Sequence, residues 1–185
     1  MIPDQVTLVT EDDVVIGALD KYEAHRVPAQ LHRAISVFLF RTDSQGPELL
    51  IQQRSSTKIV GAQQWANTVC GNVWPGETYG QCAARRLEKE LGIVSAPLQD
   101  IYTLRYAVPC NEQYAENEID HVFVGWYTGL VSPHPEEAAT AEWVNWNSVI
   151  DLQTFATRPL APWFSIMLCE EKLISQITSF VKAGK

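Results

Sequence analysis

The sequence GNVWPGETYGQCAARRLEKELG occupies residues 71–92 and predicts a helix with a marked beginning and end. Thr78 is a suitable N-cap, and Gln81 follows at the spacing of a capping box. Gly92 stands where a glycine commonly ends a helix. On this helix Arg86 and Glu90 are four residues apart and share a face. A cation that contacts phosphate and a carboxylate that binds a metal ion can therefore point into one pocket.

Short β-like segments flank this helix on both sides, so we expect a fold of mixed strands and helices. No repeat, linker or low-complexity segment interrupts the pattern, which favours a single domain over residues 1–185. The predicted strands are residues 5–10, 14–18, 34–40, 49–53, 101–106, 118–127 and 141–146, and a last helix is predicted over about residues 161–181.

Composition limits the class of protein. Of the 185 residues, 46% are hydrophobic and 19% are charged, which is enough apolar material for one domain with a proper core. The net charge is −8 and no run of lysine or arginine occurs, so neither nucleic acid nor an anionic membrane is expected as the main partner. The first residues lack the pattern of a signal peptide, and no apolar run approaches membrane-spanning length. We therefore expect a cytoplasmic protein without membrane insertion.

The cysteines suggest chemistry at one position. None of the four has CxxC spacing, so neither a zinc knuckle nor a disulfide framework is indicated, and we expect reduced thiols. A free cysteine is most often a small buried hydrophobe. Cys70, however, lies within Asn67-Thr68-Val69-Cys70-Gly71, and in that context we favour a functional thiol.

Two carboxylates further along the chain share a face. Glu116 and Glu118 have the i, i+2 spacing that places both side chains on one side of a strand. The two carboxylates could simply be solvated at the end of a strand. Alternatively, they could form a shared metal or acid/base site, which requires both on one face of the strand.

Residues 71–93 resemble the Nudix box, in which a glycine, a glutamate and a terminal Arg-Glu-x-x-Glu-Glu-x-Gly cluster build a loop and helix for a diphosphate with Mg²⁺. Two carboxylates expected of a Nudix hydrolase are replaced by Arg86 and Lys89. The carboxylate cage for hard Mg²⁺ is thereby reduced to Glu90. The resemblance implies that diphosphate binding is kept and that hydrolysis is lost.

Over most of its length the chain resembles the type 1 isopentenyl diphosphate isomerases, a family of the Nudix superfamily. The resemblance implies an α/β Nudix fold, with a mixed β-sheet sandwiched between α-helices. The motifs that carry it are Lys21-Tyr22-x-x-His25, Leu31-His32-Arg33-Ala34, Gln53-Arg54-Ser55-x-x-Lys58, Trp65, residues 67–71, Arg85-Arg86, Glu90, Arg105-Tyr106, Glu116-Asn117-Glu118 and Pro162-Trp163.

The reaction of this family explains the residue types. Isomerising an unactivated alkene requires protonation of one carbon and deprotonation of another, so two acid/base groups must flank the substrate. The family's cysteine and glutamate, on opposite faces, correspond to Cys70 and Glu118, with Tyr106 implied as a hydrogen-bond partner of the glutamate. Trp163 is implied as an aromatic wall that stabilises the carbocation, with Trp65 nearby.

The resemblance also implies a divalent metal, Mn²⁺, Zn²⁺ or Mg²⁺, beside the acid/base pair. Its ligands would be His25, His32, Glu116 and Glu118, a donor set that suits Zn²⁺ or Mn²⁺. The family's third histidine, two residues after the cysteine, is Asn72 here. An amide oxygen is a weaker ligand than imidazole for those ions, so three outcomes stay open: four remaining ligands that suffice, a preference for Mg²⁺, or loss of the metal.

A second ion, Mg²⁺, is implied where the diphosphate binds. Glu90 would hold it with the Cys70 carbonyl, and Glu77 is the other box carboxylate nearby. The cations implied to bind the diphosphate would form the local basic pocket that an acidic protein needs. The implied substrate contacts are Lys21, Arg54, Lys58, Arg86 and Trp65. His121 and His134 match no family position, and we expect them to be ordinary polar residues.

We therefore expect reversible isomerisation of isopentenyl diphosphate and dimethylallyl diphosphate by a monomer or homodimer that binds a prenyl diphosphate. One alternative is a Nudix diphosphate hydrolase, which phosphate release would reveal. Another is a related enzyme that protonates a longer isoprenoid, for example to cyclise it, which would need a longer pocket. The last is a binding module without catalysis, if Asn72 has removed the metal.

Overall fold

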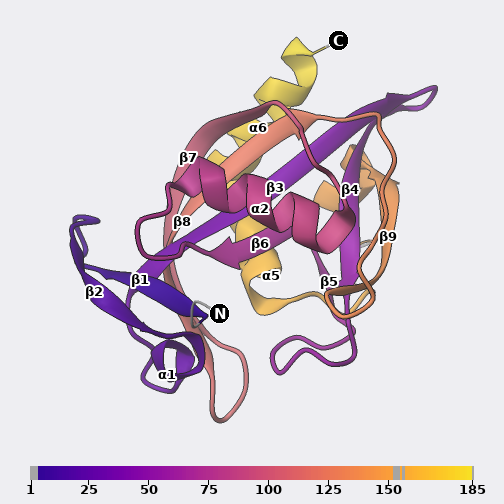
Figure 1. Ribbon diagram of the computed structural model, residues 1–185. Helices are drawn as coiled ribbons and strands as arrows, with labels where there is room; N and C mark the ends of the chain where they lie inside the picture. The colour runs from indigo at the N-terminus through magenta and orange to yellow at the C-terminus, as the bar shows by residue number, and fades with distance from the viewer. Residues whose placement is uncertain (1–3, 152–154, 156, 185) are drawn as a thin grey trace.

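The computed structural model describes residues 4–151, 155 and 157–184, which form a mixed β-sheet with helices on both faces (Figure 1). Nine strands belong to the sheet in this described part of the chain. The sheet is mixed because β3 (His32–Asp43) runs parallel to β8 (Ala115–Trp126), whereas β3 pairs antiparallel with β4 (Gly46–Arg54). The predicted architecture of a mixed sheet between helices is confirmed.

All the predicted strands are present, with ends that differ by a few residues. Two short strands were not predicted, because two and four residues are too few to show an alternating pattern. Besides β3, β4 and β8, the strands are β1 (Gln5–Val9), β2 (Val15–Asp20), β5 (Trp65–Ala66), β6 (Val69–Asn72), β7 (Leu98–Pro109) and β9 (Ala138–Asn145).

Helix α2 (Tyr79–Leu91) has the ends that the sequence predicts. Thr78 and Gln81 form the capping box: the Gln81 amide N–H donates to Thr78 Oγ1 at 3.2 Å, and the Thr78 amide N–H donates to Gln81 Oε1 at 2.8 Å. Gly92 ends the helix with a left-handed φ of 66°. The other helices are α1 (Lys21–His25), α3 (Trp146–Ile150), α5 (Pro162–Cys169) and α6 (Glu171–Ala183).

The prediction of one C-terminal helix over residues 161–181 is wrong, because α5 and α6 are separate. Glu170, with φ −81° and ψ 97°, ends α5 and begins α6. Helix α5 buries Phe164 and Leu168, and a continued helix would turn Glu171 and Lys172 onto the same stripe. The break lets α6 present its own apolar residues to the core instead.

Helices cover the sheet on both faces and create two hydrophobic cores. Along β3, Phe38 and Phe40 point to the core that contains α3, α5 and α6, whereas Val37 and Leu39 point to the core beneath α2. A strand buried on both faces reads as a continuous apolar run, which is what this segment shows. The hairpin of β1 and β2, with α1, extends from the lower left of the sheet in Figure 1.

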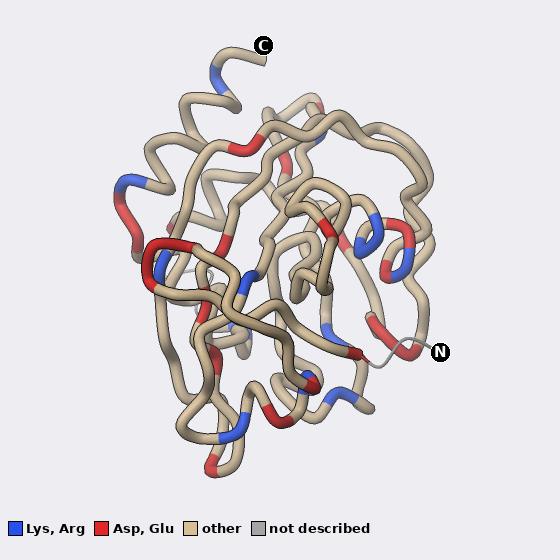
Figure 2. Tube along the Cα trace, turned by 60° about the vertical axis from the view of Figure 1, so that its left-hand side comes forward, with Lys and Arg blue, Asp and Glu red and all other residues tan. Residues whose placement is uncertain are grey.

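Charged residues of both signs are interspersed along the Cα trace in Figure 2. Within the described residues, none of the helices has the length and apolar character needed to cross a membrane. The residues 1–3, which belong to the N-terminal segment considered above, lie outside the described part.

Candidate active site

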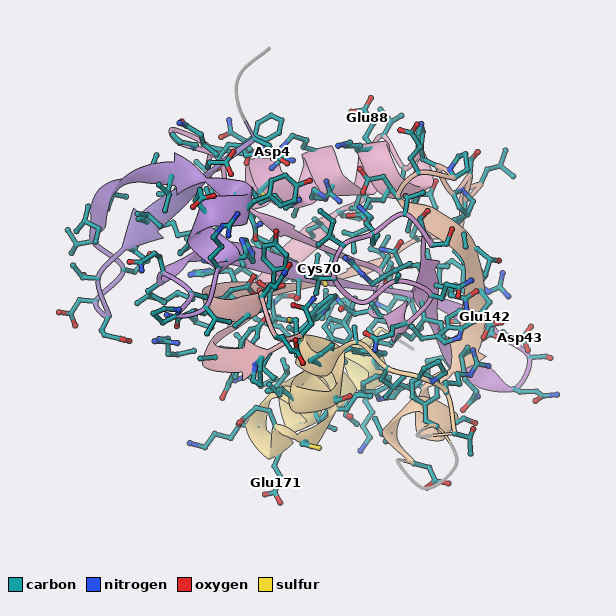
Figure 3. The ribbon with its side chains drawn as sticks, turned by 90° about the horizontal axis from the view of Figure 1, so that it is seen from below. Asp4, Asp43, Cys70, Glu88, Glu142 and Glu171 are labelled. Atoms are coloured by element: carbon teal, nitrogen blue, oxygen red, sulfur yellow. The ribbon has the colours of Figure 1, made fainter. Side chains whose placement is uncertain are left out.

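Cys70 lies on β6, which pairs antiparallel with β3 so that Cys70 stands opposite Ser36. Figure 3 places Cys70 near the middle of the molecule, between α2 and the C-terminal helices. The next residue must be small: a Cβ on Gly71 would lie 2.6 Å from Cγ of Arg86. The box glycine therefore makes room for the Arg86 side chain next to Cys70.

The thiol of Cys70 is held in one orientation. Its S–H donates to Oδ1 of Asn67 at 3.0 Å, and Asn67 is fixed in turn because its Nδ2 donates to the carbonyls of Val37 and Val69. Burial, followed by the negative charges of nearby carboxylates, raises the pKa of the Cys70 thiol. The surroundings of Cys70 therefore favour the neutral thiol over the thiolate.

Three carboxylates of β8 lie on the face of the strand that meets this thiol. Glu116 and Glu118 have the common face expected from their spacing, and Asp120 continues the series. Tyr106 stands opposite Glu118 in the β7–β8 ladder, and its hydroxyl donates a short hydrogen bond to Glu118 Oε2. Asp120 accepts a hydrogen bond from the Ser36 hydroxyl at 2.8 Å. The predicted contact of Tyr106 with Glu118 is thus present.

Asp120 was not predicted from the sequence, although it continues the alternation that links Glu116 to Glu118. Burial, followed by the charge of Glu118, raises the pKa of the Asp120 carboxyl well above its ordinary value. Burial, followed by the charge of Glu116, likewise raises the pKa of the Glu118 carboxyl well above its ordinary value. Burial alone would also raise the pKa of Glu116, but the hydrogen bond from His25 and the charge of His25 lower it.

Four side chains that are far apart in sequence form a possible metal site. One ligand atom from each of His25, His32, Glu116 and Glu118 lies within 4.8 Å of the other three. Nδ1 of His25 is 2.6 Å from the carbonyl oxygen of Lys21, and Nδ1 of His32 is 2.8 Å from that of Gln30. These backbone contacts fix both rings with Nε2 directed into the cluster, as is usual for histidine ligands.

The polar atoms of this cluster fit a divalent metal. Oε2 of Glu116 lies 2.9 Å from Nε2 of His25, and Oε1 of Glu118 lies 3.5 Å from Nε2 of His32. Nε2 of His32 is buried and makes no hydrogen bond within the described residues. Such atoms are costly unless a further group satisfies them. Asn72 faces the same place, since its Nδ2 lies 3.5 Å from Nε2 of His25. Two imidazoles and two carboxylates, with an amide at the edge, form a donor set of the kind that holds Zn²⁺ or Mn²⁺.

A cavity of about 80 Å³ joins the thiol, the carboxylates and the basic residues. Trp65, His25, His32 and Glu90 are not among the described residues at its wall. The Trp65 ring instead contacts Arg158, whose guanidinium lies 4.7 Å from its centre. The predicted residues that line the cavity are Lys21, Arg54, Lys58, Cys70, Asn72, Arg86, Tyr106, Glu116, Glu118 and Trp163.

The aromatic wall and a basic residue meet at the cavity. Trp163 is 4% exposed and stands at the start of α5, where Pro162 occupies the first turn. The Arg54 guanidinium lies 4.8 Å from the centre of its ring and donates to the carbonyl of Val60. The indole N–H of Trp163 has no hydrogen-bond partner in the described structure. A bound ligand can therefore meet both an aromatic face and a cation here.

Arg86 connects the predicted metal carboxylate to the cavity. Its Nη2 lies 2.6 Å from Glu90 Oε1, and its Nε donates to the Cys70 carbonyl at 3.2 Å. Glu90 also accepts from Nε2 of Gln52 at 2.6 Å. The predicted pair of Glu90 and the Cys70 carbonyl is therefore bridged by Arg86.

Glu137, a buried carboxylate in the loop before β9, was also not predicted from the sequence. It contacts Lys58, Arg86 and Lys89. No pattern in its own segment indicates burial, because its partners come from the loop after β4 and from α2. Burial alone would raise the pKa of Glu137, but the charges of Arg86 and Lys58 hold it well below its ordinary value.

The other box carboxylate, Glu77, has a structural partner. Arg85 donates to it from Nε at 2.7 Å and from Nη2 at 2.8 Å, and also donates to the carbonyl of Asn72 at 3.1 Å. The backbone N–H of Trp74 donates to the same carboxylate at 3.0 Å. Glu77 therefore fixes the loop between β6 and α2.

Residues 30–164 match the family model described as "NUDIX domain". The isopentenyl-diphosphate Delta-isomerase of Streptomyces griseus is 39% identical over 162 residues, which cover 87% of this chain and 80% of the relative. A protein of Aromatoleum aromaticum, isopentenyl-diphosphate Delta-isomerase 1, is 38% identical over 174 residues, 93% of each chain. The chain belongs to the isopentenyl-diphosphate Delta-isomerase family of NUDIX-domain proteins.

Solved structures agree with the NUDIX fold of this family member. DR0079 from Deinococcus radiodurans has a TM-score of 0.71 at 20% identity, with 89% of this chain and 97% of that chain covered. The Nudix hydrolase RenU from M. smegmatis has a TM-score of 0.58 at 18% identity, with 95% of each chain covered. At these identities the likeness concerns the fold, and the predicted Nudix fold is confirmed.

Proposed function

We propose that this protein catalyses the reversible isomerisation of isopentenyl diphosphate and dimethylallyl diphosphate. The observation that carries the proposal is the shared cavity: Cys70 and Glu118 both line it, together with Trp163 and the cations Arg54 and Arg86. The relatives that bear this reaction in their names are 33–43% identical to the chain and cover most of it.

The acid/base pair accounts for the hydrogen shift. One member of the pair Cys70 and Glu118 donates a proton to the terminal carbon of the alkene, which places positive charge on the tertiary carbon. The other member removes a proton from the next carbon, and the new double bond forms. The reverse reaction exchanges the two roles. Asn67 orients the thiol, and Tyr106 orients the carboxyl group.

The carbocation must be protected from water between these two proton transfers. Trp163 presents an almost buried aromatic surface at the cavity, whose negative π face stabilises a nearby positive charge.

The diphosphate is the natural ligand of the cations around the cavity. Arg54, Lys58 and Arg86 line it, and Lys21 borders it from α1. We assign Glu90 as the residue that would hold a Mg²⁺ ion bound with the diphosphate, an ion that would neutralise part of the phosphate charge. We assign His25, His32, Glu116 and Glu118 to a second divalent ion, Mn²⁺, Zn²⁺ or Mg²⁺, which would supply positive charge beside the acid Glu118.

Hydrolysis of a diphosphate fits the site less well. The helix carries Arg86 and Lys89 where the Nudix hydrolase pattern has carboxylates, and both cations are paired with Glu137. Purified protein should therefore convert isopentenyl diphosphate to dimethylallyl diphosphate in the presence of Mg²⁺ without releasing phosphate. Rapid phosphate release would support a hydrolase, and turnover of geranylgeranyl diphosphate alone would support the enzyme of longer isoprenoids.

A further inference from the structure

Three cations direct their charged groups to one carboxylate, that of Glu137. Lys58 Nζ contacts Oε2 of Glu137, and Arg86 Nη2 lies 3.0 Å from the same oxygen. Lys89 Nζ lies 3.0 Å from Oε1. Glu137 is 7% exposed, so these contacts form in a mostly dry environment. A single buried carboxylate thus links the loop after β4 to helix α2.

Glu137 reaches these cations from outside the reaction cavity. Lys58 and Arg86 line the cavity that contains Cys70, whereas Glu137 is not among the described residues at its wall. Glu137 instead lines a second hollow of about 410 Å³, which Lys58 also borders. Lys58 therefore stands between the two hollows, with Glu137 on its outer side.

Backbone contacts hold the Glu137 segment in place. The carbonyl of Glu137 accepts from the Ser55 N–H at 3.0 Å, and its own N–H donates to the carbonyl of His134 at 2.9 Å. The N–H of His134 donates to the carbonyl of Glu90 at 2.8 Å. The carboxylate is thus attached to the end of β4 and to the last turn of α2, the two elements that carry its cation partners.

The two cations at the cavity need such a partner. Lys58 and Arg86 repel each other, and burial disfavours the charged form of Lys58. A long basic side chain also loses conformational freedom when it is fixed on a ligand. A carboxylate that fixes both cations beforehand removes part of that cost and strengthens binding of the anion.

We propose that Glu137 is a positioning residue of the diphosphate site, which holds Lys58 and Arg86 in their binding positions from the side opposite the ligand. The inference rests on the proposed function only in taking a diphosphate as the group that these cations bind. It also explains the unusual box of this chain. Arg86 and Lys89 replace two carboxylates on α2, and Glu137 supplies a negative charge to both replacement cations.

Binding of inorganic diphosphate with Mg²⁺, measured by titration calorimetry, tests this role independently of the isomerisation. Glu137→Gln should raise the Kd about tenfold, since Lys58 loses its carboxylate partner and Arg86 keeps only its contacts with Glu90 and the Cys70 carbonyl. The KM for isopentenyl diphosphate should rise by a similar factor, with kcat within about twofold, because the acid/base pair is unchanged. Glu136→Gln is the matched control, since this exposed neighbour borders the same outer hollow, and its Kd should stay within about twofold.

An unchanged Kd in Glu137→Gln would overturn the positioning role, and a lower Kd would show that the carboxylate competes with the ligand instead. Absence of diphosphate binding by the unaltered protein would also overturn it. If isomerisation fails while Glu137→Gln still weakens diphosphate binding, the proposed function is wrong and the positioning role stands. If Glu137→Gln does not fold, Glu137→Asp replaces it: its shorter side chain cannot keep both contacts at Oε2, and the same rise in Kd is expected.

Discussion

The amide nitrogen of Asn72 lies 3.5 Å from Nε2 of His25, at the edge of the cluster of two histidines and two glutamates. Asn72 thus occupies the position from which a further imidazole would face the same ion. The sequence left loss of the metal open as one outcome of having asparagine at position 72. This geometry does not require that loss. The four remaining donors already converge, and Nε2 of His32 is buried without a hydrogen-bond partner in the described residues.

Replacing Asn72 by histidine should strengthen metal binding. The substitution would replace the side-chain amide of residue 72 with an imidazole, which is a better ligand for Zn²⁺ and Mn²⁺. We expect the Kd for Zn²⁺ to fall about tenfold or more in Asn72→His, as measured by competition with a chromogenic chelator. Equal affinities in the two proteins would mean that residue 72 does not reach the ion.

Removing either acid/base group should abolish isomerisation and leave the fold intact. Cys70→Ala and Glu118→Gln each delete one proton-transfer group, which is worth about 10²–10⁴-fold in rate. The measurement is the rate of dimethylallyl diphosphate formation, with thermal unfolding as the check on folding. Asp100→Asn is a suitable control, because this residue pairs with His121 outside the cavity. Near-normal activity in either active-site variant would contradict the assignment.

The aromatic wall should matter through its π face. Trp163→Phe keeps an aromatic ring beside the cavity, whereas Trp163→Leu replaces it with an aliphatic side chain. A cation–π contact in a desolvated site is worth about 2 kcal/mol, so kcat should be about tenfold or more lower in Trp163→Leu than in Trp163→Phe. Thermal unfolding of both variants controls for the lost packing volume. Equal kcat values in Trp163→Leu and Trp163→Phe would show that the π face of Trp163 does not stabilise the carbocation.

The Glu77 and Arg85 pair should make stability depend on pH. Burial alone would raise the pKa of Glu77, but the hydrogen bonds from Arg85 and Trp74 lower it below its ordinary value of 4.5. A lowered pKa in the folded state stabilises the protein above the pKa of the unfolded state, and this contribution is lost as the pH falls through the folded value. Glu77→Gln should therefore cost about 2 kcal/mol near neutral pH.

Urea unfolding of the unaltered protein and of Glu77→Gln between about pH 7 and about pH 3 checks this dependence. The difference in the free energy of unfolding should shrink as the pH falls below 4.5. A difference that stays constant over the whole range would show that the Glu77 carboxylate is not ionised in its contact with Arg85.

Sequence patterns predict those parts of the structure whose causes are local. The ends of α2 follow from Thr78, Gln81 and Gly92, which lie next to the helix that they limit. The shared face of Glu116 and Glu118 follows from strand geometry alone. The break between α5 and α6 was missed because neither glycine nor proline marks Glu170, and only the shift of the apolar stripe reveals it.

The remaining parts of the site depend on tertiary structure. His25 and His32 meet because the β1–β2 hairpin leads into α1, and because β1 pairs with β3 at Leu8 and His32. Resemblance to a family could indicate these histidines as candidate ligands, but their spacing in sequence could not. Glu137 lies in a loop with ordinary acidic composition, and its burial results from cations that other elements supply.

The most direct test follows the hydrogen atoms of the substrate. Purified protein is incubated with isopentenyl diphosphate and Mg²⁺ in deuterated water, and deuterium entry and phosphate release are both followed by NMR. An isomerase with the acid/base pair Cys70 and Glu118 places deuterium in dimethylallyl diphosphate, releases no phosphate, and loses this exchange in Cys70→Ala. The isomerase assignment would be contradicted if the unaltered protein, supplied with metal, produced no deuterated dimethylallyl diphosphate. Release of phosphate without isomerisation would also contradict it.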